Sequence, residues 1–135
     1  MRRAILAIAS DYGWIMGDIS VALVGDAEIR KINQRHLAHD YSTDVISFDL
    51  TDTDEVLEGE IIASVETADR EASEHKWSGD DELLLYIIHG MLHIIGLGRQ
   101  IAGSHYVSMV RGIHRRYAFV YWPDTLLFLP GSAAE

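Results

Sequence analysis

The sequence of 135 residues contains no cysteine. Disulfide bonds and thiolate chemistry are therefore excluded, and any metal ion must be held by histidine or carboxylate side chains. Long apolar runs are also missing, since no segment approaches the ~20 apolar residues that a membrane-spanning helix needs. The apolar run in the opening MRRAILAIAS is marginal for a secretory signal, and we interpret it as the start of an amphipathic helix. These features predict a cytoplasmic location.

Basic residues are scarce, with 11 Lys and Arg against 21 Asp and Glu and a formal net charge of -10. This balance argues against broad, non-specific nucleic-acid binding through phosphate neutralisation, but it leaves room for a local basic patch. The charge is also uneven, because 19 acidic and 7 basic residues fall in 1–96, whereas two and four fall in 97–135. We expect a single domain over residues 1–135, whose charge balance changes from about residue 98 onward.

Hydrophobic periodicity predicts alternating helices and strands up to about residue 95. Asp26 is a plausible N-cap for one helix, and Ser78 with Asp81 resembles a capping box for another. In chain order, the patterns predict a helix over 2–16, a strand over 19–24, a helix to about 37, strands over 43–50 and 59–65, a helix over 66–75 and a last helix to about 95.

The last predicted helix is apolar on nearly every side, which is typical of the buried centre of a small domain. We expect Leu84, Ile88 and Leu92 to be inaccessible to solvent. Gly96 and Gly98 suit the end of this helix.

Two histidines lie in this apolar helix, in the run HGMLHIIGLGRQ. His89 and His93 are four residues apart, so their imidazoles lie one turn apart on the same side and can converge on one metal ion. The spacing is that of the HExxH helix of metalloproteases, but Gly90 stands where that motif has its general base. The alternative is a pair of structural histidines packed in the core, each with a hydrogen-bond partner.

The run HGMLHIIG resembles the H-G-x-L-H-L-x-G-Y-D-H signature of the YbeY family of metal-dependent endoribonucleases. VALVGDAEIRKINQRHL, TDVISFDL and GEIIASVETADREA match the family in the same order, so the resemblance covers about residues 2–97. It implies an α+β fold with a small mixed sheet of about four strands and helices packed around a central, buried, histidine-bearing helix. It also implies a single-strand-specific endoribonuclease that matures the 3′ end of small-subunit ribosomal RNA and acts in ribosome biogenesis. The implied partners are ribosomal RNA and the small ribosomal subunit, without DNA or a membrane.

The family binds zinc or another divalent ion through three histidines, and the resemblance assigns the first two to His89 and His93. The third falls on Arg99, whose guanidinium cannot ligate a cation. Leu37 stands where the family has a basic residue. His105 is the nearest spare histidine, and a glycine-containing loop over 96–104 could bring it back as the third ligand; the alternative, which we favour, is a solvent-exposed loop histidine. The segment after Gly98 is expected to pack differently from the family's closing element.

Several other residues could take part in the site. Glu60 stands where the family commonly has an acidic residue and could orient a water or a histidine; otherwise it is a charge on an edge strand. Asp44 is a second carboxylate near a strand start, more typical of a local hydrogen-bonder than of a base. The candidate contacts to RNA phosphates are Arg30, Lys31 and Arg35, with His36 and His39 beside them; otherwise these residues form an ordinary solvated helix face.

Three interpretations follow from these residues. The first is a metal-dependent endoribonuclease of the YbeY type, a hydrolase of phosphodiester bonds with a weakly bound divalent ion such as zinc. The second is a catalytically impaired relative that keeps the fold and its contact with the ribosome. The third is an unrelated metal-dependent hydrolase or protease, which the bare two-histidine helix suggests and which Gly90 disfavours.

Overall fold

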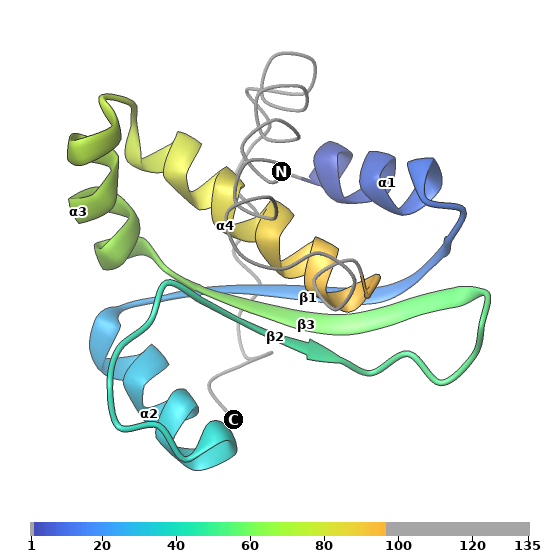
Figure 1. Ribbon diagram of the computed structural model, residues 1–135, viewed down its shortest axis with the longest axis horizontal. Coiled ribbons are helices and arrows are strands. Elements are labelled where there is room, and N and C mark those ends of the chain that lie inside the picture. The colour runs from blue at the N-terminus through green and yellow to red at the C-terminus, as the bar shows by residue number, and fades with distance from the viewer. Residues whose placement is uncertain (1, 97–135) are drawn as a thin grey trace.

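The structure is a computed structural model that describes residues 2–96 (Figure 1). Four helices and three strands occur in the order α1 (Arg2–Asp11), β1 (Ile15–Val24), α2 (Asp26–Leu37), β2 (Val45–Asp49), β3 (Val56–Ser64), α3 (Val65–His75) and α4 (Gly79–Ile94). None of the helices within this part of the chain is long and apolar enough to cross a membrane.

The three strands form one mixed sheet in the order β1-β3-β2. Strand β1 runs parallel to β3, and β2 runs antiparallel to β3 on the other side, with Ser47 opposite Ile61. The expected α+β fold with a mixed sheet is therefore confirmed. The expectation of about four strands is corrected, because the sheet within residues 2–96 has three.

Helices lie on both faces of this sheet. Figure 1 shows α1, α3 and α4 over one face and α2 over the other. Successive residues of a strand point to opposite faces, and β3 separates two apolar clusters in this way. Leu57, Ile61 and Ala63 pack with α1 and α4, whereas Ile62 packs with Ile29 and other residues of α2 and its neighbouring strands.

The first helix is shorter than its apolar pattern predicts, because it ends at Asp11 rather than near residue 16. Gly13 has a positive φ of 80°, a conformation that glycine adopts without a Cβ penalty. The amide N–H of Trp14 donates to the carbonyl of Ala9 at 2.8 Å and closes the helix end. Strand β1 therefore starts at Ile15, four residues before the alternation becomes clear in the sequence.

Helix α4 is the buried centre that its composition predicts. Leu84, Ile88 and Leu92 are 1%, 0% and 0% exposed, which confirms the expectation for all three. The capping box is also confirmed, since Ser78 Oγ accepts from the Asp81 amide at 3.1 Å and the Asp81 carboxylate accepts from the Ser78 amide.

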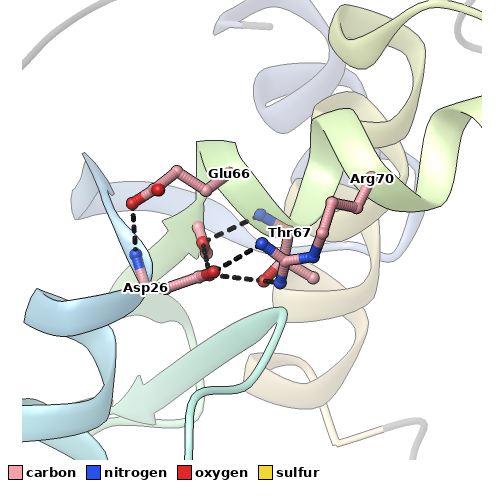
Figure 2. A network of polar contacts seen from close by, with 5 residues as sticks. Asp26, Glu66, Thr67 and Arg70 are labelled. Carbon is pink, nitrogen blue, oxygen red and sulfur yellow. Dashed lines mark hydrogen bonds and ion pairs between the residues drawn. The ribbon is translucent and has the colours of Figure 1, made fainter.

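Asp26 does not cap α2, so that prediction is wrong. The N-cap is Gly25, and the Asp26 carboxylate instead reaches α3 (Figure 2). Its Oδ1 accepts from Ser64 Oγ and Thr67 Oγ1, both at 2.7 Å, and its Oδ2 accepts from Arg70 Nη1 at 2.6 Å. The Asp26 amide donates to Glu66 Oε1 at 2.8 Å. We call this set the Asp26 network; it joins the chain after β1 to the chain after β3.

Candidate functional site

The polar side chains of α4 beyond its first residues line up along one flank of the helix. Glu82, Tyr86, His89 and His93 are separated by four, three and four residues, and at 3.6 residues per turn this spacing forms a single stripe. We call these four residues the α4 polar stripe. Sequence reasoning singled out only the two histidines, although the spacing of all four could have been read from the sequence.

The two histidines meet at the end of this stripe. Their Nε2 atoms lie 3.0 Å apart, and their rings are stacked with centroids 4.8 Å apart and an interplanar angle of 25°. Two nitrogen ligands at 2.0–2.1 Å from one tetrahedral ion would be about 3.4 Å apart, so a small rotation of either ring would suit a shared cation. His89 is half-buried and His93 is exposed, so the meeting point is close to the surface.

The surroundings of both rings favour the neutral imidazole. Burial lowers the pKa of His89, and the neighbouring His93 lowers it further, while Asp44 opposes both. Burial also lowers the pKa of His93. A neutral imidazole keeps the lone pair that a metal ion needs, whereas imidazolium has none to offer. Both residues are therefore suited in protonation state, as well as in geometry, to ligate a cation.

Gly90 lies between the histidines and faces the sheet. A Cβ at this position would lie 2.9 Å from Ile61 Cγ2 and 3.2 Å from Ile61 Cγ1, closer than packed side chains tolerate. Helix α4 thus approaches β3 through its glycine, which brings the histidine pair close to the sheet. A carboxylate at position 90 would point into this contact, so the general base of HExxH enzymes has no room here.

Within the described part of the chain, the candidate metal ligands are His89 and His93. Among residues 2–96, no group of three or more His, Asp or Glu side chains is arranged to hold a metal ion. His105, which was considered as a third ligand, and Arg99, which replaces the family's third histidine, both lie outside the described residues. The expected divergence of the segment after Gly98 also lies outside them.

Glu60 does not share a face of the sheet with the histidine pair. It follows Gly59, which faces Ile94 of α4, and precedes Ile61, which meets Gly90, so its own side chain points to the α2 face. Burial raises the pKa of Glu60, and His36 on α2 opposes that effect. The structure places Glu60 with His36 rather than with His89, and any effect of Glu60 on a site at His89 must cross the sheet.

The candidate RNA-binding residues lie on α2, also across the sheet from α4. Lys31 and Arg35 are exposed, and the guanidinium Nε of Arg30 donates to Asp40 Oδ1 at 2.9 Å. Leu37, which takes the place of the family's basic residue, is exposed at the end of the same helix. The structure therefore brings His89 and His93 together and keeps the basic residues on a separate surface.

Comparisons with known proteins agree on one family. The family described as Endoribonuclease YbeY matches residues 3–102. An endoribonuclease YbeY of Chloroherpeton thalassium is 43% identical over 124 residues, covering 92% of this chain and 86% of its own length. One from Rhodopirellula baltica is 45% identical over 98 residues, and the match spans 71% of this chain but half of that protein's length.

The fold is likewise similar to a solved structure. The solution structure of TM1509 from Thermotoga maritima has a TM-score of 0.62 to this chain at 25% sequence identity. The match covers 87% of this chain and 79% of TM1509. The arrangement of helices around a small mixed sheet is therefore shared with a protein of known structure.

Proposed function

Because the chain belongs to the YbeY endoribonuclease family, we propose that it is a metal-dependent, single-strand-specific endoribonuclease that processes ribosomal RNA. The substrate we propose is the 3′ end of small-subunit ribosomal RNA, with the small ribosomal subunit as partner and the cytoplasm as location. The observation that supports this function most strongly is the histidine pair, with Nε2 atoms 3.0 Å apart within the segment that matches the family.

His89 and His93 would hold a divalent ion through their Nε2 atoms, and zinc suits these nitrogen ligands. A bound divalent ion supplies a water of lowered pKa and stabilises negative charge on a phosphoryl oxygen. The chain's own contribution is to keep both imidazoles neutral and close together. Exposure of His93 leaves this point open to a phosphodiester.

The separate basic surface would bind a different part of the substrate. Lys31 and Arg35 on α2 are exposed and carry charge that can contact phosphates. Since α2 and α4 lie on opposite faces of the sheet, these contacts would hold RNA away from the bond that is cut (Figure 1). The proposed roles of Arg30, Lys31 and Arg35 are therefore in affinity rather than in chemistry.

The substrate class can be tested with three substrates of equal length: a single-stranded ribosomal-RNA fragment, the same fragment annealed to its complement, and a peptide. The proposal expects zinc-dependent cleavage of the single strand, with little cleavage of the duplex and none of the peptide. Peptide cleavage without RNA cleavage would establish the protease interpretation instead. His39→Ala removes an exposed histidine from outside α4 and is the control for non-specific zinc binding by histidine. Its zinc binding is measured without RNA, because His39 lies beside the candidate phosphate contacts.

A catalytically impaired relative is the second candidate function. It is favoured by Arg99 at the position of the family's third ligand and by the two-ligand set within residues 2–96. A positive charge near the site would also weaken cation binding by Coulomb repulsion. Arg99→His separates the candidates: the impaired relative gains zinc binding and RNA cleavage, whereas an enzyme with another third ligand changes little.

A further inference from the structure

The loop between α2 and β2, residues 38–44, carries an exposed pair of aromatic rings. Tyr41 is 55% exposed, and its ring stacks with that of His39, with centroids 5.3 Å apart and an interplanar angle of 14°. The Tyr41 hydroxyl lies 3.1 Å from His39 Nδ1, so a hydrogen bond also joins the two side chains. The two rings therefore form one nearly parallel aromatic surface on the outside of the molecule.

Three contacts with α2 hold this loop in place. The buried Asn33 donates from Nδ2 to the Tyr41 carbonyl at 3.0 Å, and its own carbonyl accepts from the His39 amide at 3.3 Å. The guanidinium Nε of Arg30 donates to Asp40 Oδ1 at 2.9 Å. Single exposed hydrophobic side chains are ordinary on protein surfaces, but this ring is oriented before any ligand binds. Because ordering a mobile side chain is one of the costs of binding, an oriented ring is better suited to receive a ligand.

The helix surface beside the aromatic pair is basic, although the chain as a whole is acidic. Residues 29–39 contain three Arg and Lys and no Asp or Glu, within a chain of net charge -10. Lys31 and Arg35 lie one turn apart on α2, and both are exposed. The nearby carboxylate of Asp40 is paired with Arg30. Positive charge attracts phosphates, and an aromatic face stacks on a nucleobase, so the two features together suit a single-stranded nucleic acid.

The loop also connects the basic surface with the side of the sheet that carries the histidine pair. It starts at the end of α2, on one face of the sheet, and leads into β2 (Figure 1). The first residue of β2, Val45, packs against the apolar cluster that contains α4. Within the described residues β2 is an edge strand, so an RNA strand bound on the loop can pass round this edge toward α4.

We propose that Tyr41, stacked with His39, is a platform for an unpaired base of the RNA substrate and provides the preference for single strands. This inference rests on the proposed function and adds a residue that selects the substrate. The bases of a duplex are paired and stacked on one another, so they offer no free face to an aromatic ring. Lys31 and Arg35 contact phosphates, which both forms of RNA carry, and so they do not distinguish the two.

The experiment measures the binding of fluorescent RNA to the full chain in the presence of a chelator, so that cleavage does not interfere. The three probes are a short single strand of ribosomal-RNA sequence, its duplex, and a strand of the same length that has the sugars and phosphates but no bases. Tyr41→Ala should weaken binding of the single strand by about tenfold, because stacking on an aromatic ring contributes at this level. Its affinity for the duplex and for the abasic strand, which depends on phosphate contacts, should stay at the native value.

Two further variants separate stacking from other roles of the side chain. Tyr12→Ala is the matched control, because Tyr12 is another exposed tyrosine, 42% exposed, that follows α1; it should leave all three affinities unchanged. Tyr41→Phe keeps the ring without the hydroxyl and should bind the single strand nearly as well as the native chain. The thermal unfolding midpoint of Tyr41→Ala should match the native value, because Asn33 contacts the backbone carbonyl at this position and the ring is exposed.

Native affinity of Tyr41→Ala for the single strand would overturn the inference, and so would an equal loss of affinity for the abasic strand. Zinc-dependent cleavage of RNA by the native chain alongside either result would leave the proposed function intact. Conversely, Tyr41-dependent binding by a chain that cuts no RNA would overturn the proposed function and support the platform. A native chain that binds none of the three probes would overturn both.

Discussion

The Asp26 network and the histidine pair are two polar centres of the described chain, and they differ in which groups their polar atoms contact. Asp26 accepts from Ser64, Thr67 and Arg70, and its amide donates to Glu66, so the network is closed by the chain itself (Figure 2). The two histidines direct nitrogen atoms at each other, 3.0 Å apart and next to solvent. The Asp26 network holds α2 and α3 in place, whereas the histidine pair can bind a cation from solution.

Among these substitutions, His93→Ala should have the largest effect. It should weaken zinc binding and leave the stability of the fold nearly unchanged. Removing one of two ligands should weaken zinc affinity by more than about 100-fold, because a single imidazole offers little beyond what any surface histidine provides. His93 is exposed, so the free energy of unfolding should change by less than about 0.5 kcal/mol. Zinc titration and urea unfolding of the same sample would check this. A large loss of stability with zinc affinity kept would make His93 a structural residue.

Asp26→Ala should show the opposite pattern. The substitution removes the acceptor of three donors that lie on β3 and α3, and it should lower the free energy of unfolding by about 2–3 kcal/mol. Zinc affinity should stay at the native value, since the network is separate from the α4 polar stripe. Urea denaturation measures the first quantity, and zinc titration of the folded variant measures the second. A variant that loses zinc affinity as well would show that the two centres are coupled.

Gly90→Ala tests whether the close contact between α4 and β3 fixes the position of the two histidines. The new Cβ would meet Ile61 Cγ2 at 2.9 Å, so α4 must move away from the sheet, at a cost of about 1–3 kcal/mol. The expected result is a lower unfolding midpoint together with weaker zinc binding, because His89 moves with the helix. Adding Ile61→Ala to Gly90→Ala should restore part of the zinc affinity by making room. If the single variant is fully stable, the helix has more space than the contact indicates.

The smallest expected effect is the dependence of the free energy of unfolding on pH through Asp26. The hydrogen bonds from Arg70, Ser64 and Thr67 lower the pKa of Asp26 from 3.8 to about 2. Because the folded-state pKa is depressed, the network stabilises the protein above about pH 4, and this contribution is lost as the pH falls from 4 through 2. With screening by solvent, the contribution is about 1–2 kcal/mol. Unfolding free energies of the native chain and of Asp26→Asn should therefore converge across this window, and a constant difference would contradict the shift.

Most of the fold could be predicted because its signals are local. The capping box of Ser78 and Asp81, the apolar surface of α4 and the one-turn spacing of the histidines each depend on residues within a few positions of one another. The partners of Asp26 could not be predicted, because they lie 38–44 residues further along the chain and are brought there by the pairing of β1 with β3. Because Asp is a favoured N-cap residue, local sequence predicts that Asp26 caps α2, whereas Gly25 is the N-cap.

The position of Glu60 illustrates a second limit of the sequence. Alternation along β3 places Glu60 and Ile62 on one face and Ile61 on the other, and this much is readable from the sequence. Which of the two faces receives the histidine-bearing helix depends on packing between distant segments. The contact of Gly90 with Ile61 decides it, and Glu60 consequently lies with His36 on the α2 face.

Under the proposed function, His89 and His93 together hold the ion on which RNA cleavage depends. The most direct measurement is the rate of cleavage of a single-stranded ribosomal-RNA fragment as zinc is titrated into the metal-free full chain. We expect a rate that rises and saturates with one zinc per chain, and no zinc-dependent cleavage in the double variant His89→Ala with His93→Ala. Equal, zinc-independent cleavage by the native chain and the double variant would contradict it.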